Sequence, residues 1–502
     1  MNEVKIKESP ATNPLVIIIG AGITGIASSY YLTQANIPHL ILEKSTEIGG
    51  IWHSQKWPGI RCDSYIIKYS YSFKPFLSNQ CLVSGETIHN YLNNVSKEFG
   101  IQDKVIFGVT VKKAVFHSED KVWRVYTDKG VFKTNFIINA NGYFSEPHMP
   151  TFKGSDIFKG KILHLFDLDK NRESVFKNKK ILLVGSGASA ISTVSALYGD
   201  SSTLTLLQRS PSYIYEQDNR IGIFVNIAQK LYKSGIAAPL VLVRYFLQLS
   251  DDFIFVLFRS VPWIGKLFFK LHWKKSVGQK VFEEHFQPRY NPWEQRIPIS
   301  LGLKKLVRDR KIDIITGEIE SFTETGVSLK NGQNVDFDLC VLATGFNLQF
   351  FNFDIFLDDQ KVDIQGINFY KGMMMGGIPN YFQPVGTFHT SWTQRTEAVS
   401  KLIVKILRYM SKHNFNTIII DRKKIINKPS ITPNYVTRNL SQMPVLYGAL
   451  ELPSIDKFLF YYFRKKNFIF SGDILLNSDK SRFPKEINEV EKVRESEQAA
   501  DI

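Results

Sequence analysis

Two glycine-rich segments have the spacing that binds the phosphates of a dinucleotide. The first, GAGITG, places Gly20, Gly22 and Gly25 in a G-x-G-x-x-G pattern directly after the apolar run LVIII of residues 15–19. The first glycine permits a tight turn, the second lets the backbone approach a pyrophosphate, and the third lets a helix pack closely on a strand. A helix that begins at this turn attracts the anion with its N-terminus. Glu43, which ends the apolar segment HLILE, is placed to accept hydrogen bonds from a ribose diol.

The second segment, KKILLVGSGASA, repeats the strand and the turn, and the following strand TLTLLQRS ends in Arg209 instead of an acid. An arginine pairs with the 2′-phosphate that a carboxylate would repel, so this ending favours NADP(H) over NAD(H). A solvated surface arginine is the alternative for Arg209. The residues expected to contact this second dinucleotide are Gly185, Ser186, Gly187, Ala188, Ser189, Ala190, Arg209 and Ser210.

The order strand, glycine turn, helix, strand therefore occurs twice, which predicts an α/β protein with two Rossmann-like dinucleotide-binding domains, for FAD and NADP, and a helical insertion. Strands that run into Ala140–Gly142 and Ala343–Gly345 suit the crossings between the domains. We predict the first part of the FAD-binding domain in residues 1–147, the first part of the NADP-binding domain in 148–215, a helical insertion or cap in 216–285, the second part of the NADP-binding domain in 286–338, the second part of the FAD-binding domain in 339–478, and a disordered tail in 479–502.

The composition indicates anionic partners. The 502 residues include 63 lysines and arginines against 47 acidic residues, a net charge of +16, and the hydrophobic fraction of 44% is that of a globular protein. Nucleotide phosphates, an anionic lipid surface and nucleic acid would all suit such a charge. The sequence has no zinc-knuckle, helix-turn-helix or aromatic RNA-binding pattern, so we expect no nucleic-acid partner.

The cysteines argue against several kinds of site. Only Cys62, Cys81 and Cys340 occur, and none forms a C-x-x-C pair, so we expect no disulfide framework, no metal site and no dithiol redox centre. Disulfide reductases with this architecture carry a cysteine pair beside the flavin. Without one, dioxygen becomes the leading electron acceptor. The polar N-terminal segment MNEVKIKESPATNP lacks the apolar core of a signal peptide, which predicts a cytoplasmic location.

Four further segments carry a family resemblance: GGIWHSQKWPGIRCDSY, RYNPWEQRIPI, LATGFNLQ and YKGMMMGGIPNYFQPVGTFHTSWT. Their motifs and order resemble the class B flavin monooxygenases, especially Baeyer–Villiger monooxygenases, and most closely the ethionamide-activating branch. The resemblance extends from about residue 14 to about residue 420.

One motif of that family departs from its usual form. The segment FKGKILHLFDLD retains Phe158, Gly160, His164 and Asp169, but Leu168 replaces the usual aromatic residue. In the family this segment links the two domains and helps to couple the position of NADP to the flavin chemistry. The effect of Leu168 on coupling stays open, and His164 could equally be a structural histidine.

The resemblance implies an FAD-dependent, NADPH-consuming monooxygenase. Such an enzyme inserts one oxygen atom of O2 into a ketone through a C4a-peroxyflavin, giving an ester or lactone, and also oxidises sulfur. Arg296 matches the arginine that keeps the peroxide anionic, and Asp63 would orient it. A surface ion pair with Glu294 or another carboxylate is the alternative for Arg296. The substrate would be a small apolar ketone or thioether.

The resemblance also extends the set of cofactor contacts. Together with the glycine turn, it implies FAD contacts from Gly20, Gly22, Thr24, Gly25, Glu43, Gly50, Ile51, Trp52, Asp63 and Val111. It further implies that Arg61 and Cys62 lie against NADP. Two other functions stay open: a flavin-containing monooxygenase that oxygenates nitrogen or sulfur, and a nucleotide-binding flavoprotein without turnover.

Residues 221–275 leave the Rossmann pattern and combine apolar, aromatic and basic side chains at helical spacing. Their longest uncharged piece, Ser234–Val243, has 10 residues, whereas a membrane span needs about 20, so we expect no span. We favour a helical cap that covers the substrate tunnel and buries its aromatic face in the protein. A patch that dips into an anionic bilayer is the alternative, and the two are compatible. The segment 455–470 has the same character.

Overall fold

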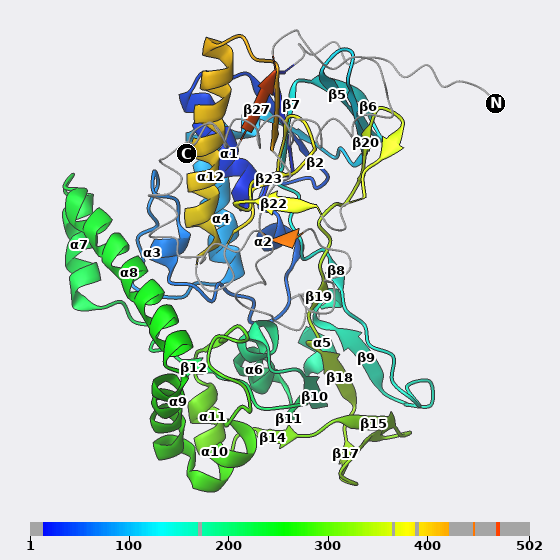
Figure 1. The fold of residues 1–502 in the computed structure, drawn as a ribbon. Helices are drawn as coiled ribbons and strands as arrows, with labels where there is room; N and C mark the ends of the chain where they lie inside the picture. The colour runs from blue at the N-terminus through cyan, green and yellow to red at the C-terminus, as the bar shows by residue number, and fades with distance from the viewer. Residues whose placement is uncertain are drawn as a thin grey trace, which may run out of the picture.

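The computed structural model describes residues 14–168, 173–363, 367–386, 391–420, 445–446 and 468–471 of the chain. Asp169, the predicted tail 479–502 and most of the segment 455–470 lie outside these residues. The described chain forms two α/β halves, one above the other in Figure 1, with a group of helices along one side of both. This confirms the predicted fold class.

The first half is built on a five-stranded parallel sheet. Its strands lie in the order β24 (Tyr381–Phe382), β7 (Phe136–Asn139), β1 (Val16–Ile19), β2 (His39–Glu43) and β3 (Val105–Phe107). The helices α1 (Ile23–Gln34), α4 (Gly85–Glu98) and α12 (Trp392–Lys412) lie on one side of it (Figure 1). The helices α1 and α12 pack closely, with the hydroxyl oxygens of Ser28 and Ser400 3.1 Å apart.

A second, mixed sheet covers the other face of the first one. Its strands are β21 (Gln360–Lys361), β20 (Asp354–Leu357), β4 (Val111–His117), β5 (Val122–Thr127) and β6 (Gly130–Thr134). Alternate residues of β1 therefore enter two cores: Ile18 packs with the helices, and Ile17 packs with Phe116 and Trp123 of the mixed sheet. This explains the unbroken apolar run of β1, because both faces of the strand are buried.

The second half repeats the arrangement. Its parallel sheet has the order β14 (Asp313–Thr316), β11 (Thr203–Gln208), β10 (Lys180–Val184), β18 (Leu339–Leu342) and β9 (Lys161–His164). The helices α5 (Glu173–Phe176), α6 (Ala188–Asp200) and α11 (Leu303–Arg308) belong to this half, as does a small antiparallel sheet of β15 (Ile319–Phe322), β16 (Gly326–Leu329) and β17 (Asn334–Asp336).

Two crossings join the halves, and they pair with each other. The strand β8 (Glu146–Pro147) leads out of the first half and pairs antiparallel with β19 (Phe346–Asn347), which leads back. Because β18 pairs with β10, residues 339–342 lie in the second sheet, whereas the predicted boundary at residue 339 placed them in the FAD-binding part. An apolar run suits a buried strand of either sheet, so the sequence of residues 339–342 does not show which sheet they join. The other domain boundaries stay a prediction.

The remaining strands are short and lie at the edges of these sheets or between the halves. They are β12 (Tyr215–Glu216) with β13 (Ile299–Ser300), β22 (Asn368–Tyr370) with β23 (Met374–Met375) and β26 (Val445–Leu446), and β25 (Thr417–Ile420) with β27 (Phe468–Ser471). Two short helices, α2 (Ile51–Ser54) and α3 (Ile66–Tyr69), lie in the loop region after β2.

The insertion is helical, as predicted from its spacing. It consists of α7 (Ile223–Lys233), α8 (Ala238–Ser260), α9 (Pro262–Val277) and α10 (Gln279–His285), which lie along the left side of Figure 1. The indole nitrogen of Trp273 in α9 donates to the carbonyl of Ile214 at 2.7 Å, which ties this helix to the second half.

Buried charges tie α8 to the first half. Arg244 donates to the carbonyl of Ser70 at 2.6 Å and lies 3.6 Å from the carboxylate of Glu397 in α12. Asp251 forms an ion pair with Lys68 of α3. Glu397 also accepts hydrogen bonds from the backbone and hydroxyl of Ser72. The charges of Arg244 and Asp251 in α8 therefore have partners in the first half.

The aromatic face of the insertion is not where we expected it. Phe246 and Phe253 of α8 are 69% and 66% exposed, so this face is not buried in the protein. The expectation holds for Phe255, Phe258, Phe269 and Trp273, which are buried. It is wrong for the exposed aromatic side chains, because the inner face of α8 also carries the polar side chains that bind the first half.

Replacing Arg244 by alanine should destabilise the protein by about 3–5 kcal/mol, since it leaves the buried carboxylate of Glu397 without its cation. Urea and thermal unfolding would measure this change. Arg220→Ala is the matched control, because Arg220 pairs with Asp218 on the exposed surface, and it should leave stability unchanged. Equal stability of the two variants would contradict a role for the buried pair.

Candidate active site

A large pocket of about 1360 Å³ lies where the carboxyl ends of the two parallel sheets face each other. Nearly all of the predicted site residues line it. They are Gly20, Gly22, Thr24, Glu43, Gly50, Ile51, Trp52, Arg61, Cys62, Asp63, Val111, Gly185, Ser186, Gly187, Ala188, Ser189, Arg209, Ser210 and Arg296. Ligands of doubly wound α/β folds bind at this end of the strands. The structure thus brings both nucleotide turns and the arginine to one cavity.

The first nucleotide turn joins β1 to α1. Gly20 has φ +101°, and a Cβ there would lie 2.7 Å from the carbonyl oxygen of Ala140. A Cβ on Gly25 would overlap the carbonyl oxygen of Gly20. Gly25 does not line the pocket, in keeping with the packing role expected for the third glycine. Only glycine therefore fits at both positions.

The second turn repeats this geometry. Gly185 has φ +144°, and a Cβ there would lie 2.6 Å from the carbonyl oxygen of Ala343. Ala190 takes the place of the third glycine and is fully buried, outside the pocket wall. In both halves the first glycine presses against the turn that begins a crossing. The pocket therefore forms where the crossings leave the sheets.

Gly187 differs from these glycines. Its φ is not positive, and no atom of the described residues lies within 4 Å of the place that a Cβ would take. The open space lies at the N-terminus of α6, which begins at Ala188. A phosphate group at this helix end would meet backbone N–H groups and the favourable end of the helix dipole.

Glu43 lies on the pocket wall, but its carboxylate already has protein partners. It accepts hydrogen bonds from the backbone nitrogens of Ala21 at 2.6 Å and Ser45 at 2.8 Å. The side chain therefore holds the glycine turn to the end of β2. A carboxylate has further acceptor sites, so a ribose hydroxyl can still donate to it.

The loop that carries Arg61, Cys62 and Asp63 lies between the two halves. A Cβ on Gly59 would overlap the carbonyl oxygen of Ser192 in α6, and Arg61 donates to the same carbonyl at 3.2 Å. The backbone of Cys62 donates to Val83 of the first half at 3.2 Å. The loop therefore contacts both halves, and Asp63 is fixed at their junction.

Asp63 and Arg296 form a two-pronged ion pair on the pocket wall. Nε of Arg296 donates to Oδ2 of Asp63 at 2.9 Å, and one terminal nitrogen donates to Oδ1 at 2.7 Å. The side chain of Arg296 is 30% exposed and that of Asp63 is 23% exposed, so water partly screens the pair. A fork of this kind fixes the plane of the guanidinium as well as its position. Arg296 therefore pairs with Asp63 and not with Glu294, which instead accepts from Asn291.

The backbone is strained just before Arg296. Trp293 has φ +68°, which is rare for a bulky side chain. Its ring meets Phe255 of α8 edge to face, with the centroids 5.5 Å apart. The insertion thus supports the bend that delivers Arg296 to the pocket. Strain held by its surroundings in this way is common at functional sites.

Burial shifts the pKa of three titratable groups beside the ion pair. Burial raises the pKa of the Cys62 thiol, and the charge of Asp63 raises it further. Burial also raises the pKa of Tyr69, whose hydroxyl accepts from the indole of Trp52 at 2.8 Å. Burial lowers the pKa of Arg61, a shift that Glu216 and Asp63 oppose. The wall beside Asp63 thus carries two guanidinium groups and one carboxylate, an excess of positive charge.

Several buried polar atoms of the pocket wall have no hydrogen-bond partner among the described residues. They are Nε and one terminal nitrogen of Arg61, the indole nitrogen of Trp57 and the amide nitrogen of Asn141. Buried donors without a partner are costly, so these groups call for a polar ligand. The large pocket, the open phosphate positions and these donors together fit a pair of dinucleotides.

Sequence reasoning missed part of the wall. Gln295, Phe346 and Trp392 line the pocket without having been predicted as site residues. Trp392 begins α12 and lies against Gly386. The segments NPWEQR, LATGFN and GTFHTSW that contain them were all recognised as motifs, so the signal was present, but the direction of each side chain depends on the fold.

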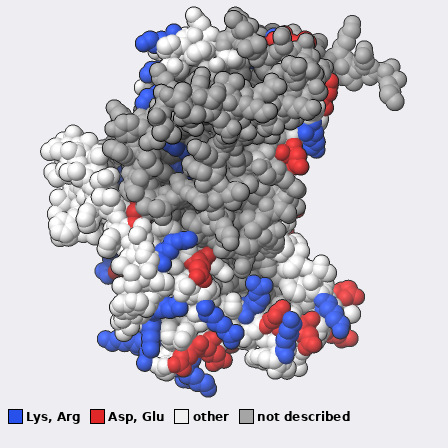
Figure 2. Space-filling model, in the orientation of Figure 1, with Lys and Arg blue, Asp and Glu red and all other residues white. Residues whose placement is uncertain are grey.

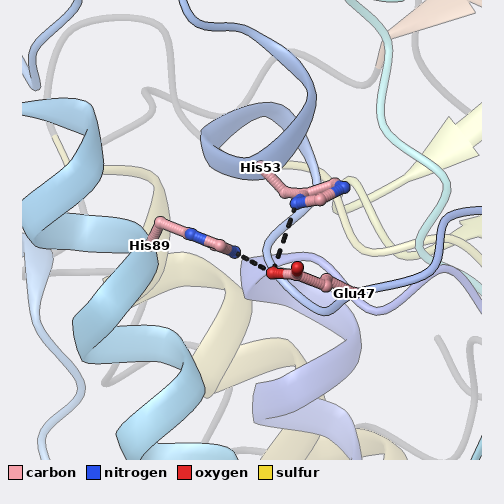
Figure 3. A group of neighbouring side chains, drawn as sticks. All are labelled: Glu47, His53 and His89. Atoms are coloured by element: carbon pink, nitrogen blue, oxygen red, sulfur yellow. Dashed lines mark ion pairs between the residues drawn. The ribbon is translucent and has the colours of Figure 1, made fainter.

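A group of two histidines and a glutamate lies beside α2, close to the pocket (Figure 3). Glu47 lies 3.6 Å from Nδ1 of His53 and 3.5 Å from Nε2 of His89. Nε2 of His89 also lies 2.9 Å from the carbonyl oxygen of Ile48, to which it donates its proton. A protonated ring nitrogen has no lone pair for a metal. The group is better explained as a set of contacts that holds the Gly49–Gly50 turn in place.

His164 and Leu168, from the segment that departs from the usual family motif, are both buried. Nδ1 of His164 accepts from the backbone of Phe166 at 3.1 Å, and burial lowers the pKa of the imidazole. Leu168 is 2% exposed and packs in the main core, where it fills apolar space in place of the usual aromatic ring. His164 is therefore held by the backbone at the end of β9, next to the crossing, while its Nε2 is buried without a hydrogen-bond partner among the described residues.

Comparison with known proteins places this geometry in a family. Residues 17–233 match the family model described as pyridine nucleotide-disulphide oxidoreductase. The three cysteines of this chain are free and buried. The match therefore reflects the paired nucleotide-binding architecture.

Curated relatives cover most of the chain. FAD-containing monooxygenase EthA of Mycobacterium tuberculosis is 32% identical over 447 residues, which are 86% of this chain and 90% of the relative. This chain belongs to the family of FAD-containing monooxygenases. The “Probable FAD-binding monooxygenase AlmA” of Acinetobacter baylyi is 31% identical over 86% of the chain and 89% of its own length. Membership of the family confirms the predicted class of enzyme, a flavin-dependent monooxygenase.

Solved structures share the fold of this monooxygenase. A steroid monooxygenase bound to NADP has a TM-score of 0.74 at 19% identity, over 92% of this chain and 100% of its own. An open structure of cyclohexanone monooxygenase has a TM-score of 0.72 at 17% identity, over 91% and 99% of the two chains. Both matches confirm the two-domain architecture predicted from the sequence.

Two glycine variants should separate the folding role of the turns from their binding role. Gly20→Ala should destabilise the protein by about 1–3 kcal/mol because φ is positive and the carbonyl of Ala140 is close. Gly187→Ala should keep the wild-type melting temperature and weaken dinucleotide binding, since its methyl group enters open pocket space. Thermal unfolding and fluorescence titration with NADPH would measure both effects. Undiminished NADPH binding by Gly187→Ala would contradict this assignment of the open space.

Proposed function

We propose that this monooxygenase uses NADPH and O2 to insert one oxygen atom beside the carbonyl of a small apolar ketone, giving an ester or lactone. The second oxygen atom leaves as water, with the electrons supplied by NADPH. The guanidinium of Arg296 on the pocket wall, held by Asp63, carries this proposal. The fold shared with steroid and cyclohexanone monooxygenases supports it.

The residues of the pocket fit FAD in the first half and NADPH in the second. The open helix end at Gly187 would receive the pyrophosphate of NADPH. Arg209, exposed at the end of β11 on the pocket rim, would pair with the 2′-phosphate. Bound FAD would accept a hydride from NADPH and pass electrons to dioxygen. The three free thiols also suit the cytoplasmic location that the sequence predicts.

Arg296 would stabilise the negative charge that develops on oxygen. A guanidinium remains protonated at any working pH, so its charge does not depend on the protonation of the site. A fixed cation in a site that excludes water needs no reorganisation as charge develops, which makes such groups effective catalysts. A negatively charged oxygen species is a nucleophile. Keeping it anionic therefore favours its attack on a carbonyl carbon over the transfer of an oxygen atom to sulfur.

Asp63 would act as a positioning residue. Its two carboxylate oxygens hold the plane of the Arg296 guanidinium, and its loop is clamped against α6. Cys62 does not compete for this role, because its raised pKa keeps the thiol protonated.

Replacing Arg296 by methionine should lower the rate of ester formation by about 10²–10³-fold while FAD is still reduced by NADPH at a similar rate. Product analysis with a cyclic ketone, together with stopped-flow reduction of the flavin, would separate the two steps. Arg308→Met is the control, because Arg308 pairs with Asp309 on the exposed surface. An Arg296→Met enzyme that still forms ester at the wild-type rate would contradict the proposed role.

The same assays distinguish the alternative chemistry. A wild-type enzyme that consumes NADPH, gives no ester from ketones and forms sulfoxide from a thioether would be an S-oxygenating monooxygenase. We expect ester formation together with some sulfoxidation.

Replacing Arg209 by alanine should lower kcat/KM for NADPH by about 10–100-fold and leave that for NADH nearly unchanged, since one charged hydrogen-bond partner of the 2′-phosphate is lost. Steady-state kinetics with the two coenzymes would measure this ratio. An equal loss with both coenzymes would show that Arg209 does not recognise the 2′-phosphate.

A further inference from the structure

The helix α8 buries polar side chains beside Leu240, Phe255 and Phe258 on its inner face, and it exposes large apolar side chains on its outer face. Its buried stripe contains Arg244, Gln248 and Asp252, each bonded to other polar groups. Its outward stripe contains Leu242 and Phe246, which are 67% and 69% exposed. An ordinary surface helix of a globular protein places these two kinds of side chain the other way round.

The apolar exposure is concentrated on the insertion. Of the 19 large apolar side chains that are exposed in the described part of the chain, 16 lie between Ile223 and Leu271. They lie on α7, α8 and α9 and on the short connection between α7 and α8. We call them the outer face; they are Ile223, Phe224, Ile227, Ile236, Val241, Leu242, Tyr245, Phe246, Leu249, Phe253, Ile254, Val256, Trp263, Leu267, Phe268 and Leu271. Exposed apolar side chains that are concentrated in this way on one part of the surface indicate an interaction surface.

The outer face projects from the body of the molecule. The helices α7 and α8 extend sideways from the two halves in Figure 1, and the lobe that they form at the left of Figure 2 shows neither blue nor red. A projecting helical pair of this kind can enter the boundary between lipid headgroups and acyl chains. No helix among the described residues is long and apolar enough to cross a bilayer.

The charges around the outer face are all positive. Lys230 and Lys233 are exposed on α7, and Lys266 and Lys270 are exposed among the apolar residues of α9. Residues 221–277 contain only two acids, Asp251 and Asp252. Asp251 pairs with Lys68 of the first half, and Asp252 is buried. The surface that remains combines apolar side chains with cations.

We propose that the outer face docks the protein on the surface of an anionic lipid bilayer. The apolar side chains would enter the interfacial region, and the lysines would meet the phosphates of the headgroups. A symmetric dimer through the same face would bring its lysines near their own copies, which is unfavourable. The surface charge of the bilayer and the net charge of +16 instead attract each other.

Sedimentation of the holoenzyme with lipid vesicles tests this directly. The protein should bind vesicles of phosphatidylcholine and phosphatidylglycerol, bind pure phosphatidylcholine vesicles more weakly, and lose binding as salt is raised. The double variant Leu242→Glu, Phe246→Glu should bind the anionic vesicles at least about tenfold more weakly, since two large side chains can no longer be buried. Lys266→Gln with Lys270→Gln should reduce the preference for anionic lipid.

The control variant is Ile157→Glu, which replaces an apolar side chain that is 52% exposed but lies outside the insertion. It should bind vesicles as the wild type does. All variants should keep the wild-type flavin content and melting temperature, because each changed side chain is exposed. The ketone assay is not part of this test, so its outcome is independent of the proposed reaction.

Two results would overturn the proposal. One is equal vesicle binding by the wild type and the double variant. The other is a wild type that ignores anionic vesicles and sediments as a dimer that the double variant converts to a monomer, which would show that the outer face binds a second copy of this chain.

Discussion

The ion pair between Arg296 and Asp63 joins segments that are 233 residues apart in the sequence. Asp63 lies in a loop pressed against α6 of the second half and bonded to the first half. Arg296 follows the strained bend at Trp293, which packs on α8. The pair therefore forms only when both halves and the insertion are in place. A cation that depends on so many contacts is held in one position, which the proposed electrostatic role requires.

The pocket itself follows from a repeated piece of geometry. In each half the first glycine of the nucleotide turn presses on the carbonyl where a crossing begins, Ala140 in one half and Ala343 in the other. The crossings then pair with each other through β8 and β19. The two nucleotide turns are thereby brought to face each other across one cavity. Local structure shapes each turn, but only the crossings make the two turns adjacent.

Local patterns predicted the parts of this arrangement that local structure determines. The apolar run before Gly20 became β1, and the spacing after Gly187 became α6. Nearly every residue assigned to a cofactor lines the pocket, because the motifs set both the turn and the exposed backbone. The resemblance supplied Arg296 and Asp63, whose contact the glycine spacing could not have predicted.

The features that were not predicted depend on distant contacts. The strand β18 joins the second sheet by pairing with β10, and its apolar sequence does not predict which sheet it joins. The carboxylate of Glu43 binds two backbone nitrogens, which requires the folded turn. The buried charges of α8 lie inward because Lys68 and Glu397 of the first half offer partners to them. Helical spacing shows that a helix is amphipathic, but it does not show which face turns inward.

A crystal structure of the enzyme with FAD and NADP+ bound would test the placement of the catalytic cation most directly. We expect the guanidinium of Arg296 to face the isoalloxazine ring while it remains paired with Asp63, with the nicotinamide held on the side of Arg61. A structure in which Arg296 leaves Asp63 and turns into solvent, away from the ring, would contradict the proposed chemistry.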